Sequence, residues 1–289
     1  MRPHVLVSLG RDHLQPKRCF RLNRDNLLET MPTSAFVREF GVAKTHLKKR
    51  KGYPGRAPVA EPDLTKPCPG YAPKFYEDPV LEEAGWADRN PADVDWSKRT
   101  SYDGSLDFSL DGLPRNPNGR TGLVGRGVLG KWGVNHAADP VLIRGFSGCS
   151  RGEVLLVTRK DNGKLAFPGG FVDEGENPAA AALRELREEA LDGTPPEQLD
   201  AALENVDKKK VVFYQGYVDD DRNTDAAWIE TSAFLIKVDD KLSCLLGDPK
   251  GGDDALSAHW VPIDDSLFSC MHASHGDMLK QAIALLFAD

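Results

Sequence analysis

The sequence predicts an α+β fold, an α/β/α sandwich built on a mixed β-sheet and preceded by a smaller irregular lobe. Three observations support this prediction: short apolar and β-branched runs beyond residue 140, two helical patterns among them, and a first third crowded with proline and glycine. We place a boundary near residue 120, which gives an N-terminal lobe of residues 1–120 and a larger domain of residues 121–289.

The N-terminal lobe is basic, although the whole chain of 289 residues has a net charge of −7. Residues 1–60 hold 13 Lys/Arg against 4 Asp/Glu, a net +9, so the remaining 229 residues carry −16. The basic run 48–51 fits a solvated linker, and it also fits contact with nucleic acid, a membrane surface or an organelle importer. Because the larger domain is acidic, we expect no nucleic-acid partner for it.

Proline and glycine determine the structure expected between residues 52 and 127. Eight prolines lie between Gly52 and Pro91, and each interrupts helices and strand ladders, so irregular, extended structure is expected there. A second stretch rich in Gly, Asn and Pro, residues 113–127, leads into the regular patterns of the larger domain.

The larger domain combines predicted strands with two predicted helices. Residues 178–191 are strong helix formers, with Asn177 at the N-cap and Pro178 in the first turn, where a missing N–H has no cost. Apolar residues at helical spacing predict a second helix over residues 273–287. Runs rich in apolar and β-branched residues predict six strands, at residues 140–144, 153–159, 165–167, 210–218, 228–238 and 258–263.

Hydropathy and cysteine usage limit the choice of cellular compartment. No apolar run approaches the roughly 20 residues that cross a bilayer, and the N-terminus lacks the apolar centre of a signal peptide, so we expect no membrane segment in this chain. The five cysteines are scattered and form no Cys-x-x-Cys pair, which disfavours a disulfide framework and a zinc site. A reducing compartment fits best, so a cytoplasmic location is expected, with the mitochondrion as the alternative.

The chemistry is concentrated in residues 170–189, which read G-x5-E-x7-R-E-L-x-E-E. On a helix, Glu185 shares one face with Glu188 and Glu189, three and four residues later. Like charges at these spacings destabilise a helix, whereas Mg²⁺ or Mn²⁺ among carboxylate oxygens turns their repulsion into coordination. A solvated acidic helix is the competing interpretation. It is disfavoured by Gly170 and Glu176, which stand at set distances before the helix, and by the strand-like residues that precede them.

This pattern resembles the Nudix box, with one departure: Leu191 and Asp192 stand where the consensus has a glycine and an apolar residue. The resemblance implies hydrolysis of a nucleoside diphosphate joined to another group, by water attacking phosphorus beside Mg²⁺ or Mn²⁺. Arg184 would orient a glutamate or tie the helix to the preceding loop, and Gly169 and Gly170 would bring backbone close to the metal or phosphate. The implied metal ligands are Gly169, Glu176, Glu185, Glu188 and Glu189.

Four further segments resemble the ADP-ribose pyrophosphatases of animal mitochondria and the homologous ADP-ribose-sensing C-terminal domain of melastatin-type TRP cation channels. They are residues 114–127, 132–140, 216–231 and 252–255. The resemblance covers residues 113–289 well and residues 1–112 only faintly. It implies ADP-ribose as the small-molecule partner, with AMP and ribose 5-phosphate as products.

Within these segments, Arg222 can place two donors on a phosphate, although a salt bridge within its own loop explains it equally well. Asp220 can accept hydrogen bonds from sugar hydroxyls. His275 matches a histidine that the channel domain uses at the ligand, whereas His272 stands where the relatives carry tyrosine. His136 is as readily a satisfied core histidine. The expected substrate contacts outside the box are His136, Asp139, Arg159, Asp220, Arg222 and His275.

The general base stays open between three alternatives. It is a glutamate of the box, Glu230 on a strand expected to face the site, or Asp253 or Asp254 in a Gly-rich loop that could close over the substrate. An ordinary acidic turn is the competing interpretation of that loop.

Two functional hypotheses follow. The chain is an enzyme that hydrolyses ADP-ribose, or it is the sensing domain of a larger channel polypeptide, in which ADP-ribose shifts a gating equilibrium. The vertebrate channel domains are degraded at the Arg-Glu-x-x-Glu-Glu positions, whereas this chain keeps all four charged positions, which favours catalysis.

Overall fold

The computed structural model describes residues 74–288, apart from residues 79, 82–83, 110, 149 and 250–254. The basic run 48–51 and most of the proline-rich region therefore lie outside the described residues. The same holds for the candidate bases Asp253 and Asp254.

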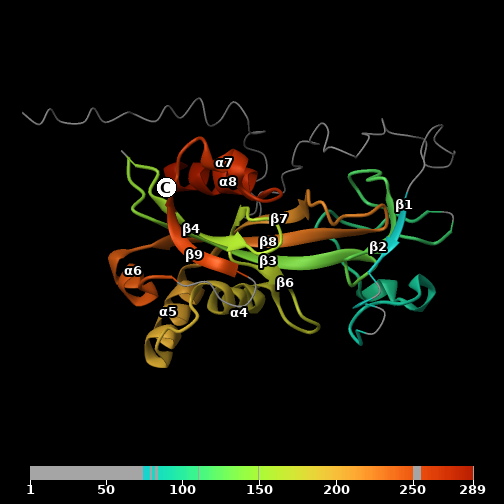
Figure 1. Ribbon diagram of the computed structural model, residues 1–289, viewed down its shortest axis with the longest axis horizontal. Helices are drawn as coiled ribbons and strands as arrows, with labels where there is room; N and C mark the ends of the chain where they lie inside the picture. The colour runs from blue at the N-terminus through green and yellow to red at the C-terminus, as the bar shows by residue number, and fades with distance from the viewer. Residues whose placement is uncertain are drawn as a thin grey trace, which may run out of the picture.

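A seven-stranded mixed sheet forms the centre of the larger domain (Figure 1). Its longest strands, β3 (Gly133–Arg144) and β8 (Ala227–Val238), run parallel in the middle, and β7 (Val211–Val218) pairs antiparallel with β8. On the other side of β3 lie short and edge strands that pair antiparallel: β4 (Glu153–Arg159), β5 (Leu165–Ala166), β6 (Gly170–Phe171) and β9 (Ala255–Pro262).

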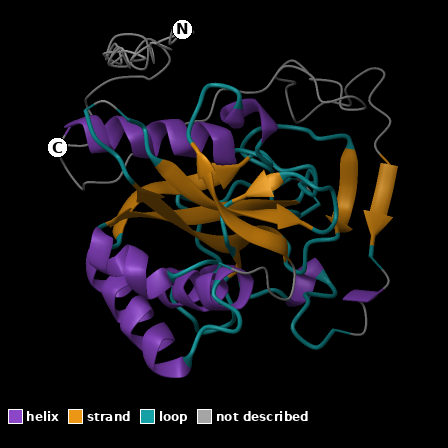
Figure 2. Cartoon of the chain, turned by 60° about the vertical axis from the view of Figure 1, so that its left-hand side comes forward, coloured by secondary structure: helices purple, strands orange, loops and turns teal. Residues whose placement is uncertain are grey.

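Helices cover both faces of this sheet (Figure 2). One face buries a core with α4 (Pro178–Ala190), α5 (Pro196–Lys209) and α6 (Asp240–Leu246), and the other buries a core with α7 (Leu267–Cys270) and α8 (His275–Ala288). These two apolar layers confirm the predicted α/β/α sandwich. Within the described part of the chain, no helix has both the length and the apolar character to span a membrane.

Two differences from the expected elements have physical reasons. The first predicted strand begins at Gly133, seven residues before Pro140, which was taken as its start. Proline is tolerated inside β3 because the residues of β3 that pair with β6 end at Ala138 and those that pair with β4 begin at Ile143, so neither antiparallel ladder uses the backbone N–H of residue 140. The helices α5 and α6 were not predicted: α6 has only seven residues, too few to show a helical repeat, and most of the 14 residues of α5 are polar.

The described part of the N-terminal lobe is mostly irregular, as expected. Asp88 accepts hydrogen bonds from the Arg99 side chain at 2.5 Å and from the backbone N–H of Trp132 at 2.9 Å, which joins the lobe to the start of β3. Its regular elements are β1 (Lys74–Glu77) and the 3₁₀ helices η1 (Pro91–Asp93) and η2 (Trp96–Lys98). β1 pairs in parallel with β2 (Leu123–Gly127), which lies just beyond residue 120.

Candidate active site

The glutamates of the box lie on α4 and in the loop between β6 and α4, so the start of this helix fixes their positions. The side chain of Asn177 accepts a hydrogen bond from the Ala180 N–H at 2.9 Å, and Pro178 occupies the first helical position. This N-cap satisfies one of the free donors at the helix start and fixes where α4 begins. Ala182 and Leu186 are buried against the sheet, and Glu185 and Glu189 lie beside them around the helix, which brings these two carboxylates to the backbone of Gly169 and Gly170.

Arg184 gathers the acidic side chains of the box. Its Nε and Nη2 donate to the Glu176 carboxylate at 3.1 and 2.9 Å, and Nη1 donates to Glu185 at 2.6 Å and to Glu188 at 3.3 Å. Nη2 also donates to the carbonyl oxygen of Phe171 at 2.9 Å. The guanidinium therefore joins α4 to the loop before it and offsets the repulsion between neighbouring carboxylates.

The two glycines before the loop are required by close approach. A Cβ on Gly170 would lie 2.5 Å from Oε1 of Glu185, and a Cβ on Gly169 would lie 2.4 Å from Oδ1 of Asp139. The Gly169 N–H donates to Oε2 of Glu189 at 2.9 Å. Only residues without a side chain let the backbone lie this close to three carboxylates.

Burial raises the pKa of these three carboxyl groups. Desolvation is the largest cause for Glu189, whose pKa is raised to about 7 although the Gly169 N–H opposes the shift, and the Glu185 charge adds to it. Desolvation also raises the pKa of Asp139 to about 7, against the hydrogen bond from Thr231. The pKa of Glu185 is raised by the same burial. Burial thus disfavours the charged form of three carboxyl groups that lie close together.

This donor set fits a divalent cation. Glu185, Glu188 and Glu189 come from one turn of α4 and offer hard carboxylate oxygens, the ligands that Mg²⁺ and Mn²⁺ take in proteins. Among the described residues, no three His, Cys, Asp or Glu side chains already converge as a closed cation site, because Arg184 and Gly169 hold these carboxylates instead. A cation would offset the raised pKa of the buried glutamates.

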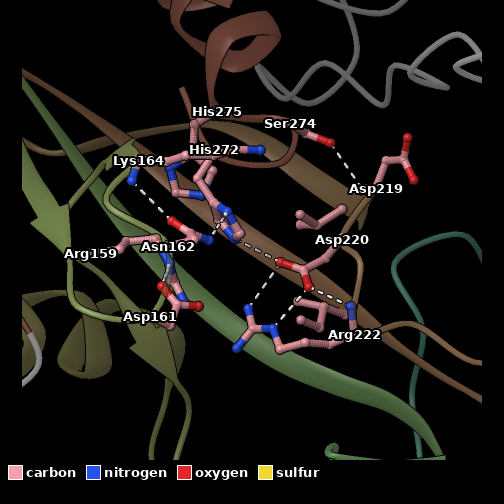
Figure 3. A network of polar contacts seen from close by, with 12 residues as sticks. Arg159, Asp161, Asn162, Lys164, Asp219, Asp220, Arg222, His272, Ser274 and His275 are labelled. Carbon is pink, nitrogen blue, oxygen red and sulfur yellow. Dashed lines mark hydrogen bonds and ion pairs between the residues drawn. The ribbon is translucent and has the colours of Figure 1, made fainter. Parts of the chain in front are cut away.

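Two arginines, Arg159 at the end of β4 and Arg222 in the loop after β7, each pair with an aspartate two residues away (Figure 3). Arg159 donates from Nε and Nη2 to Asp161 at 2.9 and 2.8 Å, and Arg222 donates from Nε and Nη2 to Asp220 at 2.8 and 3.0 Å. The predicted alternative for Arg222, a salt bridge within its loop, is therefore present. Both positive charges act on Asp139 and lower its pKa, which places them beside the same buried carboxyl group.

His275 lies beneath the β5 strand rather than in open solvent. Its Nδ1 accepts a hydrogen bond from the Phe167 N–H at 2.9 Å, and its ring stacks on the Phe167 ring at 4.9 Å between centroids. Burial lowers the pKa of His275 to about 3, so the ring is neutral at physiological pH, with its proton on Nε2.

His136 and Glu230 occupy paired positions on β3 and β8, facing the N-terminal lobe. His136 Nε2 contacts the Thr100 carbonyl oxygen at 2.9 Å, and burial lowers its pKa. The fully buried Glu230 accepts hydrogen bonds from Ser101 Oγ at 2.7 Å, from the Tyr102 N–H at 2.7 Å and from Nε1 of Trp228, on the same strand, at 3.0 Å. The lobe thus provides partners that local sequence did not indicate.

Two adjoining hollows of about 560 and 520 Å³ lie between the N-terminal lobe and the loop before α4. Trp86, which is 58% exposed, lines both hollows. The second extends to Arg184 and Glu185. The residues common to both are Trp86, Lys131, His136, Val172, Asp173 and Glu174.

Sequence reasoning gave no role to three side chains that contact the candidate site residues or one another. Thr231 Oγ1 donates to Oδ2 of Asp139 at 2.6 Å, and His272 Nε2 contacts Oδ2 of Asp220 at 3.0 Å. Asn162 Nδ2 contacts His272 Nδ1 at 3.4 Å. Each pair joins positions far apart in the chain, so no local pattern could have indicated it.

Known proteins match both parts of the chain. The NUDIX domain family matches residues 136–282, and the family described as NUDT9-like, N-terminal domain matches residues 59–133. "ADP-ribose pyrophosphatase, mitochondrial" of Rattus norvegicus is 37% identical over 227 residues, 71% of this chain and 63% of the rat protein. The chain thus spans less than two thirds of that relative.

Two further relatives differ in size. "Putative nudix hydrolase 6" of Caenorhabditis elegans is 39% identical over 230 residues, 74% of this chain and 85% of the worm protein. "Transient receptor potential cation channel subfamily M member-like 2" of Nematostella vectensis is 36% identical over 251 residues, 76% of this chain but 16% of the channel. With the domain match, the box geometry and the worm relative in agreement, the chain belongs to the Nudix hydrolase family.

Proposed function

We propose that this chain hydrolyses ADP-ribose to AMP and ribose 5-phosphate with the help of Mg²⁺, for which Mn²⁺ can substitute. Nudix hydrolases generally use divalent metals. The observation that carries the proposal is the intact box, in which Glu185, Glu188 and Glu189 lie together beside Gly169 and Gly170. The names of the rat and worm relatives, a pyrophosphatase and a putative nudix hydrolase, support the same activity.

The box residues take separate roles in this proposal. Glu185, Glu188 and Glu189 hold the cation, which neutralises the diphosphate and activates the attacking water. Glu176 acts through Arg184, since both of its oxygens accept from that guanidinium. Arg184 keeps the ligands gathered before the cation binds, which reduces the ordering required at binding.

The substrate is placed between the box and the two facing arginines. Arg159 and Arg222 supply positive charge opposite the glutamates, and Arg222 lies over the Phe171 ring at 5.5 Å. The hollow that runs from Trp86 to Glu185 offers room for the remainder of the nucleotide. In this arrangement His136 and Asp139 line the strand between the two regions, and His275 supports it from below.

A box glutamate is the general base that the contacts favour. Glu230 is fully buried and its carboxylate accepts three hydrogen bonds, so its oxygens are committed to the N-terminal lobe. Asp253 and Asp254 lie outside the described residues and stay candidates. Rates of Glu188→Gln, Glu230→Gln and Asp253→Asn/Asp254→Asn variants, compared at saturating substrate, separate the three alternatives.

We also propose the boundary near residue 120 as the division between an N-terminal lobe and the catalytic domain. We propose the cytoplasm as the location of the protein. The mitochondrion is the alternative, and the name of the rat relative supports it. Fluorescence microscopy of the tagged full chain beside a mitochondrial marker distinguishes the two.

The proposal is tested by incubating the chain with ADP-ribose and Mg²⁺ and separating the products by chromatography. AMP and ribose 5-phosphate in equal amounts are expected. A panel of other nucleoside diphosphate derivatives tests substrate specificity. Comparable rates on all of them would contradict the proposal that ADP-ribose is the preferred substrate.

A second candidate is a sensing domain of a cation channel, favoured by the channel of Nematostella vectensis, which matches 76% of this chain. A sensing domain requires binding but not turnover. ADP-ribose binding measured by calorimetry, together with no detectable AMP, would support the sensor and reject the enzyme.

A further inference from the structure

A continuous set of polar contacts joins three loops beside the box (Figure 3). It begins in the turn between β4 and β5, where the Lys164 N–H donates to Oδ1 of Asn162 at 3.0 Å. Asn162 Nδ2 contacts Nδ1 of His272 at 3.4 Å, and His272 Nε2 contacts Oδ2 of Asp220 at 3.0 Å. Asp220 in turn holds Arg222 through both carboxylate oxygens.

The direction of these contacts fixes the form of the histidine ring. Because Oδ1 of Asn162 accepts from the backbone, its amide nitrogen faces His272 and can only donate. In a neutral ring Nδ1 is therefore the acceptor, and Nε2 carries the proton that is donated to Asp220. The amide thus selects the tautomer that the carboxylate requires.

Asp220 is a buried carboxylate whose charge depends on its donors. Its side chain is 2% exposed, and burial alone would raise its pKa, but hydrogen bonds from His272 and Arg222 hold that pKa well below its usual range. The Arg222 N–H donates to it as well, at 2.9 Å. Without the His272 donor, Oδ2 of Asp220 keeps the hydrogen bond from Arg222 Nη2 but loses the contact that ties the carboxylate to the turn before α8, so the position of the carboxylate and of the guanidinium on it is less well fixed.

The far end of the set lies at the box. The Arg222 guanidinium lies over the Phe171 ring at 5.5 Å, and Phe171 follows Gly170. Two donors of the guanidinium, Nε and Nη2, lie on the edge that faces Asp220. Since the group is planar with five donors, its opposite edge is directed away from that carboxylate.

We propose that His272 is a positioning residue: its Nε2–H holds Asp220, and through Asp220 it fixes the Arg222 guanidinium beside Phe171 for contact with the diphosphate. Its part in catalysis rests on the proposed function, whereas its hold on Arg222 does not. It acts through Arg222 and touches no reacting atom.

Steady-state kinetics with ADP-ribose and Mg²⁺ test the catalytic part. His272→Phe, which keeps an aromatic ring without a donor, is expected to raise KM about tenfold with kcat changed much less, because the interaction lost is binding of the phosphate. His272→Gln, which restores a donor, should recover part of that loss. In an Arg222→Ala background, His272→Phe should add no further increase in KM.

An equal increase in KM with and without Arg222 would overturn the proposal, because the histidine would then act independently of the arginine. An unchanged KM in His272→Phe would overturn it as well. Thermal unfolding of each variant shows whether it is folded. If His272→Phe does not fold, Asn162→Ala, at an exposed position, removes the tautomer-selecting donor and should raise KM in the same direction.

NMR without substrate tests the structural part separately. With the ring in its neutral form, nitrogen chemical shifts should identify His272 as the Nε2–H tautomer. The Arg222 Nε–H signal should be protected from solvent exchange and should lose that protection in His272→Phe. An Nδ1–H ring, or unchanged protection, would overturn the inference. A chain that neither hydrolyses nor binds ADP-ribose would reject the proposed function, and these signals would still decide the role of His272.

Discussion

Replacing Gly170 with alanine should disable the box without unfolding the chain. The added Cβ would lie 2.5 Å from Oε1 of Glu185, whereas an ordinary contact begins at 3.4 Å, so the carboxylate must move by about 0.9 Å. A misplacement of ~1 Å in a catalytic group costs roughly 100-fold in rate, which corresponds to about 2.7 kcal/mol of activation free energy. Because the obstructing atoms are the end of a flexible side chain, the backbone need not shift.

The assay is kcat for ADP-ribose hydrolysis at saturating Mg²⁺, measured with the melting temperature of the same variant. Gly148→Ala is the matched control, since a Cβ there meets nothing within 4 Å. The expected result is a loss of about 100-fold for Gly170→Ala, with the control unchanged and both variants melting near the parent. Full activity in Gly170→Ala would refute the requirement for Glu185 at its observed position.

Three further predictions follow from the site. Arg184→Gln should lower kcat by roughly 10- to 100-fold and lower the melting temperature, since Glu176, Glu185 and Glu188 lose their shared donor. Arg187→Gln, on the same helix, is the variant against which kcat and melting temperature are compared. The free energy of unfolding should fall as pH drops from about 6.5 toward 3, because His275 binds a proton in the unfolded chain but stays neutral in the folded one. His275→Asn should flatten this pH dependence in thermal melts. An unchanged slope would exclude His275 as its source. Removing divalent metal with EDTA should abolish turnover, and adding Mn²⁺ should restore it and raise the melting temperature, whereas a melting temperature indifferent to metal would argue against a cation among the box glutamates.

Local features of the fold were predictable from sequence. The start of α4 depends on Asn177 and Pro178, which are neighbours in the chain, and the box glutamates follow at fixed helical spacing. Six strands were recognisable from apolar and β-branched composition, whereas β1, β2 and the two-residue β6 were not. By contrast, the true start of β3 was hidden by Pro140, whose tolerance depends on the ends of two neighbouring strands.

Contacts between distant segments were not predictable. Glu230 was expected to face the substrate, and its strand position alone could not reveal that Ser101 and Tyr102 of the N-terminal lobe would take up its carboxylate. The pairing of Asp220 with His272 joins a loop after β7 to the turn before α8. Such pairings depend on how the layers come together, which a single sequence without long-range information does not contain.

The central claim is that water attacks the diphosphate of ADP-ribose at the box. Hydrolysis in water enriched in heavy oxygen, with products examined by mass spectrometry, tests it most directly. The account predicts AMP and ribose 5-phosphate in equal amounts, one heavy oxygen on the phosphate of one of them, and loss of both products in Glu188→Gln/Glu189→Gln. Release of ADP and ribose, or unchanged product formation by that double variant, would contradict it.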